Sequence, residues 1–281
     1  MKFLKKRKKE SHKGDFGHLF VMAGSSGYTG AALLCSQAAL LSGSGLVTLG
    51  IPESLNTIVA KRIWELMTLP LPETKEKSFS LRALPAILKK VEACDAVAIG
   101  PGLSRNRETV RLVHQLIPRI KKPMVIDADG LNAVSENPLV LKKAKAPVIV
   151  TPHPGEMARL IRKTGKEVQR DRKKVAKLFS FGYNVITVLK GYHTLVASPT
   201  GKLYVNPTGN PGMAKGGCGD VLTGIIGSFL GQGMSPFAAA CNGVYVHGLA
   251  GDLAVKEKGE VSLLAGDLLK FLPSAFKKVT Y

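Results

Sequence analysis

The sequence predicts an α/β protein with a central, mostly parallel sheet that is covered by helices on both faces. Short, fully apolar runs recur along the chain and alternate with longer helix-like stretches. Strands without polar alternation are typical of parallel sheets whose two faces are both buried. Of the 281 residues, 30 are glycine and only 6% are aromatic. This composition favours helices packed closely on a sheet over an all-β sandwich.

The first expected elements are a strand, a turn and a helix. An apolar run at 19–23 leads into a glycine-rich turn at 24–30, and an Ala- and Leu-rich stretch at 31–41 predicts a helix. Residues 70–80, which begin with Pro-Leu-Pro-Glu, predict a surface loop. Further strands are expected at 46–49, 96–99, 124–126, 148–150 and 185–189.

Glycine and polar residues directly follow four of the expected strands. These segments are Gly100-Pro101-Gly102, Asp127-Ala128-Asp129-Gly130-Leu131-Asn132, Thr151-Pro152-His153-Pro154-Gly155-Glu156 and Lys190-Gly191. Ligands of open α/β sheets bind beyond the carboxyl ends of the strands. The sequence therefore predicts one shared crevice at this edge of the sheet.

The chain carries 40 Lys and Arg residues against 20 Asp and Glu residues, a formal net charge of +20. Such a charge favours anionic partners, including phosphorylated small molecules and nucleic acid. Two runs concentrate it: Lys2, Lys5, Lys6, Arg7, Lys8 and Lys9, and then Lys163, Lys166, Arg170, Arg172, Lys173 and Lys174. Neither run is interleaved with aromatic residues, so we interpret them as a solvated tail and a solvated helix face, and expect no nucleic-acid partner. With no repeat or linker evident, we expect a basic tail at 1–10 and a single domain at 11–281.

Cysteine usage and hydropathy predict a cytoplasmic protein. The four cysteines are scattered without a C-x-x-C pair, which argues against a disulfide framework and a zinc site. No H-x-x-x-H or H-E-x-x-H pattern predicts a transition-metal site. Polar residues 10–13 follow the basic start, so we expect no signal peptide. No uncharged apolar stretch is long enough to cross a bilayer, so we expect no membrane partner.

The sharpest motif is Gly216-Gly217-Cys218-Gly219-Asp220. Apolar residues then recur on one face of an expected helix: Val221, Leu222, Ile225, Ile226, Phe229 and Leu230. The free N–H groups and the dipole at a helix N-terminus favour an anion, so Gly216, Gly217, Cys218 and Gly219 are predicted to form an anion hole. Asp220 at its mouth could take a proton from a hydroxyl that attacks phosphorus. The alternative is that Asp220 caps the helix, and the complete motif favours the catalytic interpretation.

Four other segments each leave two interpretations open. The turn at 24–30 either contacts substrate or is a plain connection, and it does not match G-x-G-x-x-G. Asp127 and Asp129 should point to opposite sides, one capping a helix and the other facing the crevice or a magnesium-bound water. His153, between two prolines, is either a structural or a functional residue. Residues 190–194 suit either phosphate contact or a hairpin turn. Neither a P-loop nor a nucleophile elbow is present.

Several short motifs occur in a defined order over residues 11–255. They are His12-Lys13-Gly14-x-x-Gly17, Gly27-Tyr28-Thr29-Gly30-Ala31, Gly100-Pro101-Gly102-Leu103, Asp127-Ala128-Asp129-Gly130-Leu131-Asn132, Thr151-Pro152-His153-Pro154-Gly155-Glu156, Leu189-Lys190-Gly191 and Gly216-Gly217-Cys218-Gly219-Asp220. Together they resemble the ADP-dependent NAD(P)H-hydrate dehydratases, although single motifs recur in related kinases. The resemblance implies a ribokinase-like fold, a three-layer sandwich around a central, mostly parallel sheet.

The resemblance also implies roles for individual residues. Ala31, Gly102 and His153 would contact the hydrated nicotinamide nucleotide, and Asp220 would meet it at the reacting end. The residues that would contact the adenine nucleotide are Lys190, Gly191, Tyr192, His193, Thr194 and Gly219. Cys218 stands where many members carry Thr, so a hydroxyl contact would be absent while the backbone N–H groups remain.

The implied activity is a hydro-lyase reaction that repairs coenzymes. The S-epimer of hydrated NADH or NADPH (NADHX or NADPHX) would return to NADH or NADPH at the expense of ADP, with release of AMP and phosphate. Mg²⁺ would bridge nucleotide oxygens, and ADP would be preferred over ATP. The family implies a homo-oligomer, a tetramer. Some members carry an N-terminal epimerase domain; the matched region begins near residue 11, so a separate epimerase is expected.

Two alternatives belong to other classes. A small-molecule kinase of the same superfamily, acting on a hydroxymethyl vitamin precursor, would share the Gly-Gly-x-Gly-Asp motif. The His-Lys-Gly and Thr-Pro-His-Pro-Gly-Glu motifs disfavour this kinase. A basic nucleic-acid-binding protein that has lost catalysis is disfavoured by the intact glycine-rich motif.

Overall fold

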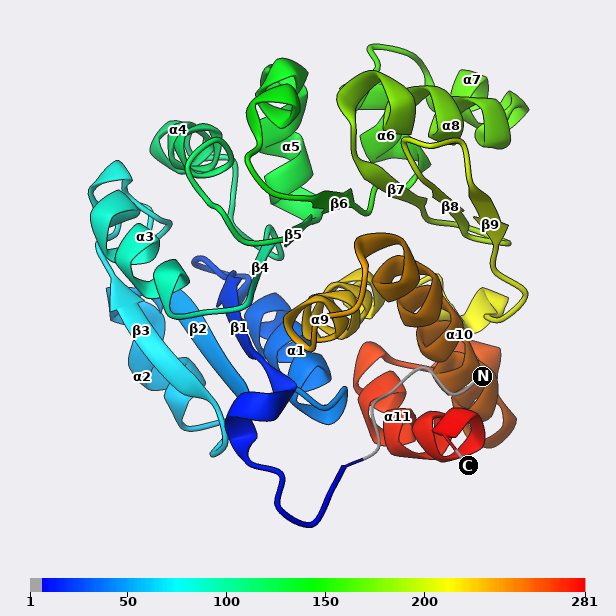
Figure 1. The fold of residues 1–281 in the computed structure, drawn as a ribbon, viewed down its shortest axis with the longest axis horizontal. Helices are drawn as coiled ribbons and strands as arrows, with labels where there is room; N and C mark the ends of the chain where they lie inside the picture. The colour runs from blue at the N-terminus through cyan, green and yellow to red at the C-terminus, as the bar shows by residue number, and fades with distance from the viewer. Residues whose placement is uncertain (1–6, 281) are drawn as a thin grey trace.

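The structure, a computed structural model, describes residues 7–280 and is built around one nine-stranded sheet (Figure 1). The strand order is β3-β2-β1-β4-β5-β6-β7-β8-β9. The pairings from β3 through to β7 are parallel, and β8 and β9 add antiparallel pairings at one edge. The strands are β1 (His18–Met22), β2 (Leu46–Pro52), β3 (Met67–Leu71), β4 (Ala96–Ile99), β5 (Met124–Ile126), β6 (Val148–Val150), β7 (Ile186–Leu189), β8 (Leu195–Ala197) and β9 (Leu203–Val205).

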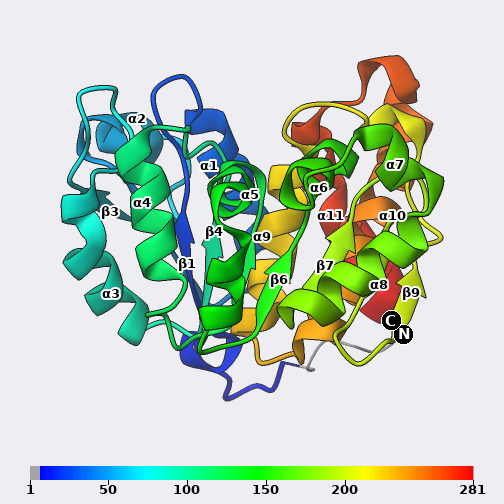
Figure 2. The same ribbon diagram turned by 90° about the horizontal axis from the view of Figure 1, so that it is seen from above.

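Two groups of helices cover the two faces of the sheet, which gives three layers (Figures 1 and 2). One face carries α1 (Thr29–Leu41), α2 (Asn56–Ala60), α9 (Cys218–Gly231), α10 (Pro236–Ser262) and α11 (Ala265–Thr280). The other carries α3 (Leu84–Glu92), α4 (Arg107–Leu116), α5 (Ala128–Glu136), α6 (Pro154–Leu160), α7 (Gly165–Arg170) and α8 (Arg172–Tyr183). Short 3₁₀ helices are η1 (Lys13–Phe16), η2 (Glu53–Leu55), η3 (Leu81–Ala83), η4 (Pro138–Lys143) and η5 (Pro211–Met213). The predicted α/β class is confirmed.

Alternate residues of each central strand enter two separate cores. In β1, Leu19 and Val21 pack with one group of helices, whereas Phe20 and Met22 pack with the other. Successive side chains of a strand point to opposite faces, so a strand covered on both faces needs apolar residues at every position. This requirement explains the unbroken apolar runs from which the strands were predicted.

Helix α9 lies at the centre of one face and is buried on all sides. It packs on β1, β4 and β5 and against α1 and α10. The prediction of a single apolar face was wrong, because Thr223, Gly224 and Ser228 are also buried. These small residues let neighbouring helices approach: a Cβ added to Gly224 would lie 2.1 Å from the carbonyl oxygen of Cys35 in α1.

The prediction of a surface loop at 70–80 was wrong in two ways: the first residues belong to a strand, and part of the segment is buried. Pro70 and Leu71 belong to β3, where they pair with Ile51 and Pro52 of β2. Leu71 and Phe79 are both buried. Because β3 is an edge strand, it tolerates a proline that a central strand would not, and the sequence pattern alone did not reveal this.

The basic tail is described only from residue 7 onward, so the predicted charges of Lys2, Lys5 and Lys6 lie outside the described residues. Arg7 is not simply solvated, contrary to the prediction. Its guanidinium carbon lies 3.8 Å from the centre of the Phe16 ring, and Nη2 donates to the carbonyl oxygen of Gly43 at 3.0 Å. Among the described residues, no helix is both long and apolar enough to cross a bilayer. All four cysteines are free thiols.

Candidate active site

Four predicted strand ends lie side by side in the sheet. The strands β4, β5, β6 and β7 are consecutive neighbours and parallel, so their carboxyl ends share one edge. A cavity of about 910 Å³ opens there. Its wall includes Asp127, His153, Lys190, Gly191, Tyr192, His193, Thr194, Asn206, Gly216, Gly217, Cys218, Gly219, Asp220 and His247. The prediction of one shared crevice is confirmed for the ends of β5, β6 and β7.

The glycine-rich segment forms the N-terminal turn of α9. Gly217 is the N-cap residue with φ +92°, a left-handed conformation that a residue with a side chain rarely adopts. The N–H of Cys218 donates to the carbonyl of Lys215 at 3.5 Å, and the N–H of Val221 donates to the carbonyl of Gly217 at 3.2 Å. Within the described chain, the N–H groups of Gly219 and Asp220 donate to no acceptor. They are therefore available to an anion, as the motif predicts.

Gly219 allows a lysine and a carboxylate to approach the turn. A Cβ at this position would lie 3.3 Å from Nζ of Lys190 and 3.5 Å from Oδ2 of Asp127. The absence of a side chain at Gly219 therefore lets both charged groups lie close to the N-terminal turn of α9.

Asp220 does not cap α9, so the capping interpretation was wrong. It stands three positions beyond the N-cap Gly217, and its carboxylate forms no hydrogen bond or ion pair with any described residue. Burial, followed by the negative charge of Asp127, raises its pKa to about 7, although the positive charge of Lys190 opposes the increase. A carboxyl group with a pKa near neutrality suits general acid–base work.

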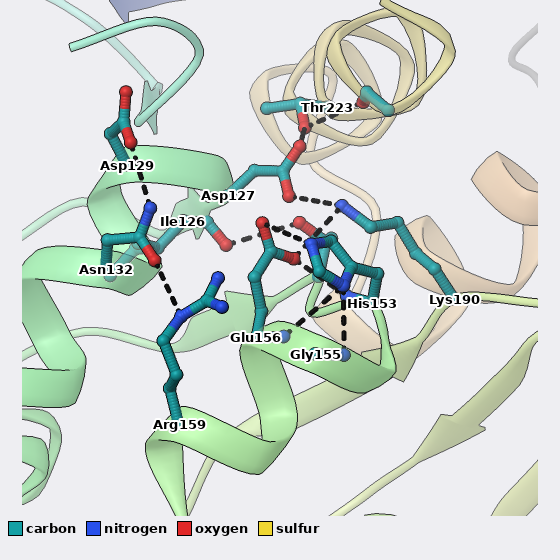
Figure 3. Close-up of polar contacts among 12 residues, drawn as sticks. Ile126, Asp127, Asp129, Asn132, His153, Gly155, Glu156, Arg159, Lys190 and Thr223 are labelled. Atoms are coloured by element: carbon teal, nitrogen blue, oxygen red, sulfur yellow. Dashed lines mark hydrogen bonds and ion pairs between the residues drawn. The ribbon is translucent and has the colours of Figure 1, made fainter. Parts of the chain in front are cut away.

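A partly buried ion pair lies beside this turn (Figure 3). Oδ1 of Asp127 is 2.6 Å from Nζ of Lys190, and Oδ2 accepts a hydrogen bond from Oγ1 of Thr223 at 2.7 Å. Oε2 of Glu156 is 3.7 Å from the same ammonium group. Burial by itself would lower the pKa of Lys190, but the charges of Asp127 and Glu156 raise it above its ordinary value. The ammonium group thus stays charged next to the N-terminal turn of α9.

Asp127 and Asp129 point apart, as predicted (Figure 3). Asp127 faces Lys190, and its side chain makes no capping bond to α5 although it occupies the N-cap position. Asp129 accepts hydrogen bonds from the N–H of Ser104 at 3.0 Å and from Nδ2 of Asn132 at 2.9 Å. Asp127 is therefore the residue that faces the crevice. The prediction that one of the two side chains caps the helix was wrong, because neither makes a capping bond to α5.

His153 caps α6 and also lines the cavity. Its Nδ1 accepts from the N–H groups of Gly155 and Glu156 at 3.0 and 3.3 Å, and Glu156 Oε2 accepts from the N–H of His153 at 2.7 Å. Burial lowers the pKa of His153, against the opposing charge of Glu156. A neutral ring that accepts at Nδ1 carries its proton on Nε2. The structural interpretation is confirmed, and substrate contact by His153 stays a prediction.

Residues 190–194 form the turn between the antiparallel strands β7 and β8, so the hairpin interpretation is correct. The same residues line the cavity. Tyr192 is 80% exposed, and the centre of its ring lies 3.9 Å from that of His193. Nucleotide contact by these residues stays a prediction. In the structure, Nζ of Lys190 is paired with the carboxylates of Asp127 and Glu156.

Ala31 and Gly102 lie next to each other rather than in the cavity wall. A Cβ on Gly102 would approach the Cβ of Ala31 to 3.2 Å. The turn after β1 is tied to the same loop, since Gly24 donates from its N–H to Pro101 at 2.8 Å and Ser25 Oγ donates to Gly102 at 2.8 Å. This place, between β1 and β4, is where the strand order reverses direction, and ligands of open sheets bind at such a point.

Sequence reasoning missed His247, on α10. Its Nε2 lies 2.8 Å from the carbonyl oxygen of Cys218. Burial lowers the pKa of His247 to about 4, so the ring is neutral and must carry its proton on Nε2 to donate to that carbonyl. It lines the cavity and holds the first turn of α9. Because His247 lies 29 positions from Cys218, no local pattern revealed it.

The layered sheet and a glycine-rich helix N-terminus with free N–H groups at its edge define the class of this protein: it is a nucleotide-binding α/β protein of the ribokinase-like fold. A family model for NAD(P)H-hydrate dehydratase matches residues 19–274. The chain belongs to this family, which confirms the resemblance seen in its motifs.

Named relatives agree with this assignment. The bifunctional NAD(P)H-hydrate repair enzyme Nnr of Moorella thermoacetica is 46% identical over 98% of the chain and 52% of its own length. The ADP-dependent (S)-NAD(P)H-hydrate dehydratase of Neisseria meningitidis is 39% identical over 94% of the chain and 86% of its own length. The chain thus spans about half the length of the bifunctional relative.

A solved structure shows the same fold. The ADP/ATP-dependent NAD(P)H-hydrate dehydratase of Bacillus subtilis, co-crystallised with ATP/Mg²⁺, superposes with a TM-score of 0.83 and is 33% identical. The match covers 98% of the chain and 94% of that structure.

Proposed function

We propose that this chain is a hydro-lyase that dehydrates the S-epimer of NADHX and NADPHX at the expense of ADP. The observation that carries the proposal is the unpartnered carboxylate of Asp220 beside the free N–H group of Gly219, at the N-terminus of α9. Such a pair can accept a proton and stabilise a transferring phosphate in one place. The names of the Neisseria and Bacillus relatives support this substrate and this use of nucleotide.

The proposed reaction has two steps. The hydroxyl at carbon 6 of the hydrated ring attacks the terminal phosphorus of ADP while Asp220 takes its proton, and the bond from phosphorus to the AMP oxygen breaks. The lone pair of the ring nitrogen then expels phosphate. Loss of a proton from carbon 5 restores the double bond, so the products are AMP, phosphate and the intact coenzyme. Phosphorylation is needed because hydroxide is a poor leaving group.

The proposed ligand contacts divide between two parts of the site. The adenine nucleotide lies in the cavity against residues 190–194 and Gly219, and the N–H groups of the α9 turn hold the transferring charge. The hydrated nicotinamide nucleotide lies against Ala31, Gly102 and His153. The position of Ala31 and Gly102 outside the cavity wall supports separate places for the two ligands.

Magnesium completes the proposal and would enter the site on the nucleotide. Among residues 7–280, no group of three or more His, Cys, Asp or Glu side chains could hold a metal ion by itself. Asp220 is therefore assigned to the proton transfer and not to the metal. When bound, Mg²⁺ neutralises charge on the phosphate oxygens.

Incubation of the protein with hydrated NADH and either ADP or ATP tests the proposal. We expect the absorbance of the intact coenzyme to return, with AMP and phosphate formed and with faster turnover on ADP than on ATP. A stable phosphorylated product without recovery of coenzyme would favour the small-molecule kinase instead. If turnover were as fast with ATP as with ADP, the preference for ADP would be contradicted but the dehydratase activity would not.

Four further features belong to the same proposal. The protein acts as a homo-oligomer, resides in the cytoplasm, binds no nucleic acid and relies on an epimerase activity to supply the S-epimer. Size-exclusion chromatography with light scattering tests the first. A salt-dependent gel-shift assay with DNA tests the third, because phosphate contacts make such binding fall steeply with salt.

A further inference from the structure

Arg172 is the first residue of α8, and its side chain is directed at the end of β7 rather than at solvent. The sequence predicted a solvated basic face that included Arg172, Lys173 and Lys174. This was wrong for Arg172, whose side chain is half-buried, whereas Lys173 and Lys174 are exposed. Asp171 caps α8 by accepting from the N–H of Lys174 at 3.0 Å, which fixes the helix start from which Arg172 projects.

Three backbone carbonyl groups accept hydrogen bonds from Arg172. Its Nη2 donates to the carbonyl oxygens of Leu189 and Lys190 at 3.1 and 3.3 Å, and its Nη1 donates to that of Tyr192. The guanidinium lies over Gly191, where an added Cβ would be 3.1 Å from Nη2. One side chain therefore ties the end of β7 to the turn that follows it.

The turn that Arg172 holds has an unusual backbone. Gly191 and His193 have φ angles of +135° and +50°, both outside the range of ordinary helices and strands. Hydrogen bonds from a charged donor are stronger than neutral ones, and a planar guanidinium offers its donors in fixed directions. The three carbonyl groups are therefore fixed relative to one another, and so are the cavity-lining residues of the turn.

We propose that Arg172 is a positioning residue that preorganises the 190–194 hairpin for an adenine nucleotide. The inference rests on the proposed function. Arg172 is absent from the cavity wall, so it acts through the hairpin and not by touching the ligand. A binding loop that is already ordered loses less entropy when its ligand binds. Loss of Arg172 therefore weakens nucleotide affinity and leaves the chemistry at Asp220 in place.

Three variants separate this role from a loss of charge. Arg172→Gln removes the charge and the forked donor, and Arg172→Lys keeps the charge on a single ammonium group. Lys173→Gln is the matched control, because it removes one positive charge from the exposed neighbouring position.

Calorimetric titration with ADP is the first measurement. The Kd should rise about ten- to hundredfold in Arg172→Gln and by about three- to tenfold in Arg172→Lys, and should stay at the wild-type value in Lys173→Gln. In turnover assays, the KM for ADP should follow these changes while kcat varies by less than about threefold.

Hydrogen exchange of the backbone amides at 191–194 in the nucleotide-free protein is the second measurement. Exchange should be faster in both Arg172 variants, unchanged in Lys173→Gln, and unchanged in β4 and β5 in all three. Should Arg172→Gln fail to fold, Arg172→Lys carries the test alone.

Wild-type ADP affinity and wild-type hairpin exchange in Arg172→Lys would overturn the inference. Faster exchange spread evenly over the whole protein would overturn it too, because that is the result of a general stabilising role. If the wild-type protein itself fails to bind ADP, the proposed function fails instead, and hairpin exchange still decides whether Arg172 holds the turn.

Discussion

Asp220 holds its proton more tightly than an ordinary aspartate, and this should appear in the pH dependence of turnover. Burial and the charge of Asp127 raise its pKa to about 7, so its basic form is lost as pH falls through neutrality. We expect kcat/KM to rise with pH up to about 7 and then level off. Asp220→Asn should lower kcat by about 10²–10⁴-fold and remove this limb. Near-native turnover in Asp220→Asn would disprove the proposed role.

The same residue should cost the protein stability. Because the pKa of Asp220 in the folded state lies above its ordinary value of 3.8, the folded protein binds more protons between pH 4 and 7, and stability falls as pH rises through that range. The Asp220→Asn protein should not lose stability in this way. Its free energy of unfolding should equal that of the wild type at pH 4 and exceed it by at most about 4 kcal/mol above pH 7.

Thermal unfolding at a series of pH values tests whether the stability difference between Asp220→Asn and wild type grows as pH rises. Glu136→Gln, at an exposed position, is the control and should follow the wild-type curve. A constant difference between Asp220→Asn and wild type across pH 4–8 would contradict the account of Asp220.

At the scale of residues, the sequence predicted site residues that lie within one contiguous motif. It did not predict pairs of residues that are far apart in the chain. Asp220 and the α9 turn stand within five positions, so local pattern sufficed. The partners of Asp127 lie 63 positions away in Lys190 and 96 positions away in Thr223. Only the packing of β5, β7 and α9 brings these three side chains together. The periodic patterns of a single sequence do not reveal contacts over such separations.

At the scale of elements, β3 offers a direct test of the corrected edge of the sheet. Leu71 is 1% exposed, whereas Met67 in the same strand is 38% exposed. Leu71→Ala should lower the free energy of unfolding by about 2–5 kcal/mol, because it leaves a cavity in a packed core. Met67→Ala should cost less than about 1 kcal/mol. Equal and small effects in urea denaturation would mean that residues 70–80 behave as the surface loop predicted from sequence.

The start of α9 depends on a bond from another helix, and His247 supplies it. His247→Phe keeps the ring and removes the donor to Cys218, so we expect a loss of about 1 kcal/mol at pH 7. The pKa of about 4 lies below the ordinary 6.5, so the wild type loses stability as pH falls from 6.5 to 4, and the variant does not. In chemical denaturation, the stability advantage of the wild type should shrink as pH falls through that interval and then reverse, because the loss can reach about 3 kcal/mol. A wild-type advantage that grows toward acid pH would show that His247 is charged in the folded protein.

Among the strands inside the sheet, some bounds were predicted correctly, whereas β1 begins and ends one residue earlier than expected and β2 extends beyond its expected end at 49 to Pro52. The strands β4, β5 and β6 begin and end where their apolar runs do. Both β3 and β9 were missed, because an edge strand carries proline or polar residues and lacks the unbroken apolar run. The burial of α9 on all sides was not predicted, because Thr223, Gly224 and Ser228 have the pattern of a polar helix face although they are buried.

At the scale of the whole molecule, we expect the basic N-terminus to affect stability and not catalysis. Its described part, 7–10, lies outside the cavity wall, but Arg7 stacks on Phe16 and bonds to Gly43. Deletion of residues 2–9 should change kcat by less than about twofold and lower stability by about 1 kcal/mol, the size of an exposed cation–π contact with one hydrogen bond. Arg7→Ala should reproduce the stability loss on its own. A large fall in turnover in a folded truncated protein would contradict this expectation.

The central place of α9 has a consequence for synthesis on the ribosome. This helix covers β1, β4 and β5, yet it follows every strand of the sheet in the chain. On this face α1 already contacts β1, but β4 and β5 lack their cover from α9 until residue 231 has left the exit tunnel, after the helices of the opposite face are made. A nascent chain with an uncovered apolar surface is prone to aggregate and is the kind of species that chaperones bind. Because the α9 turn is also part of the proposed nucleotide site, we expect the nascent chain to complete that site in the same event that covers this surface.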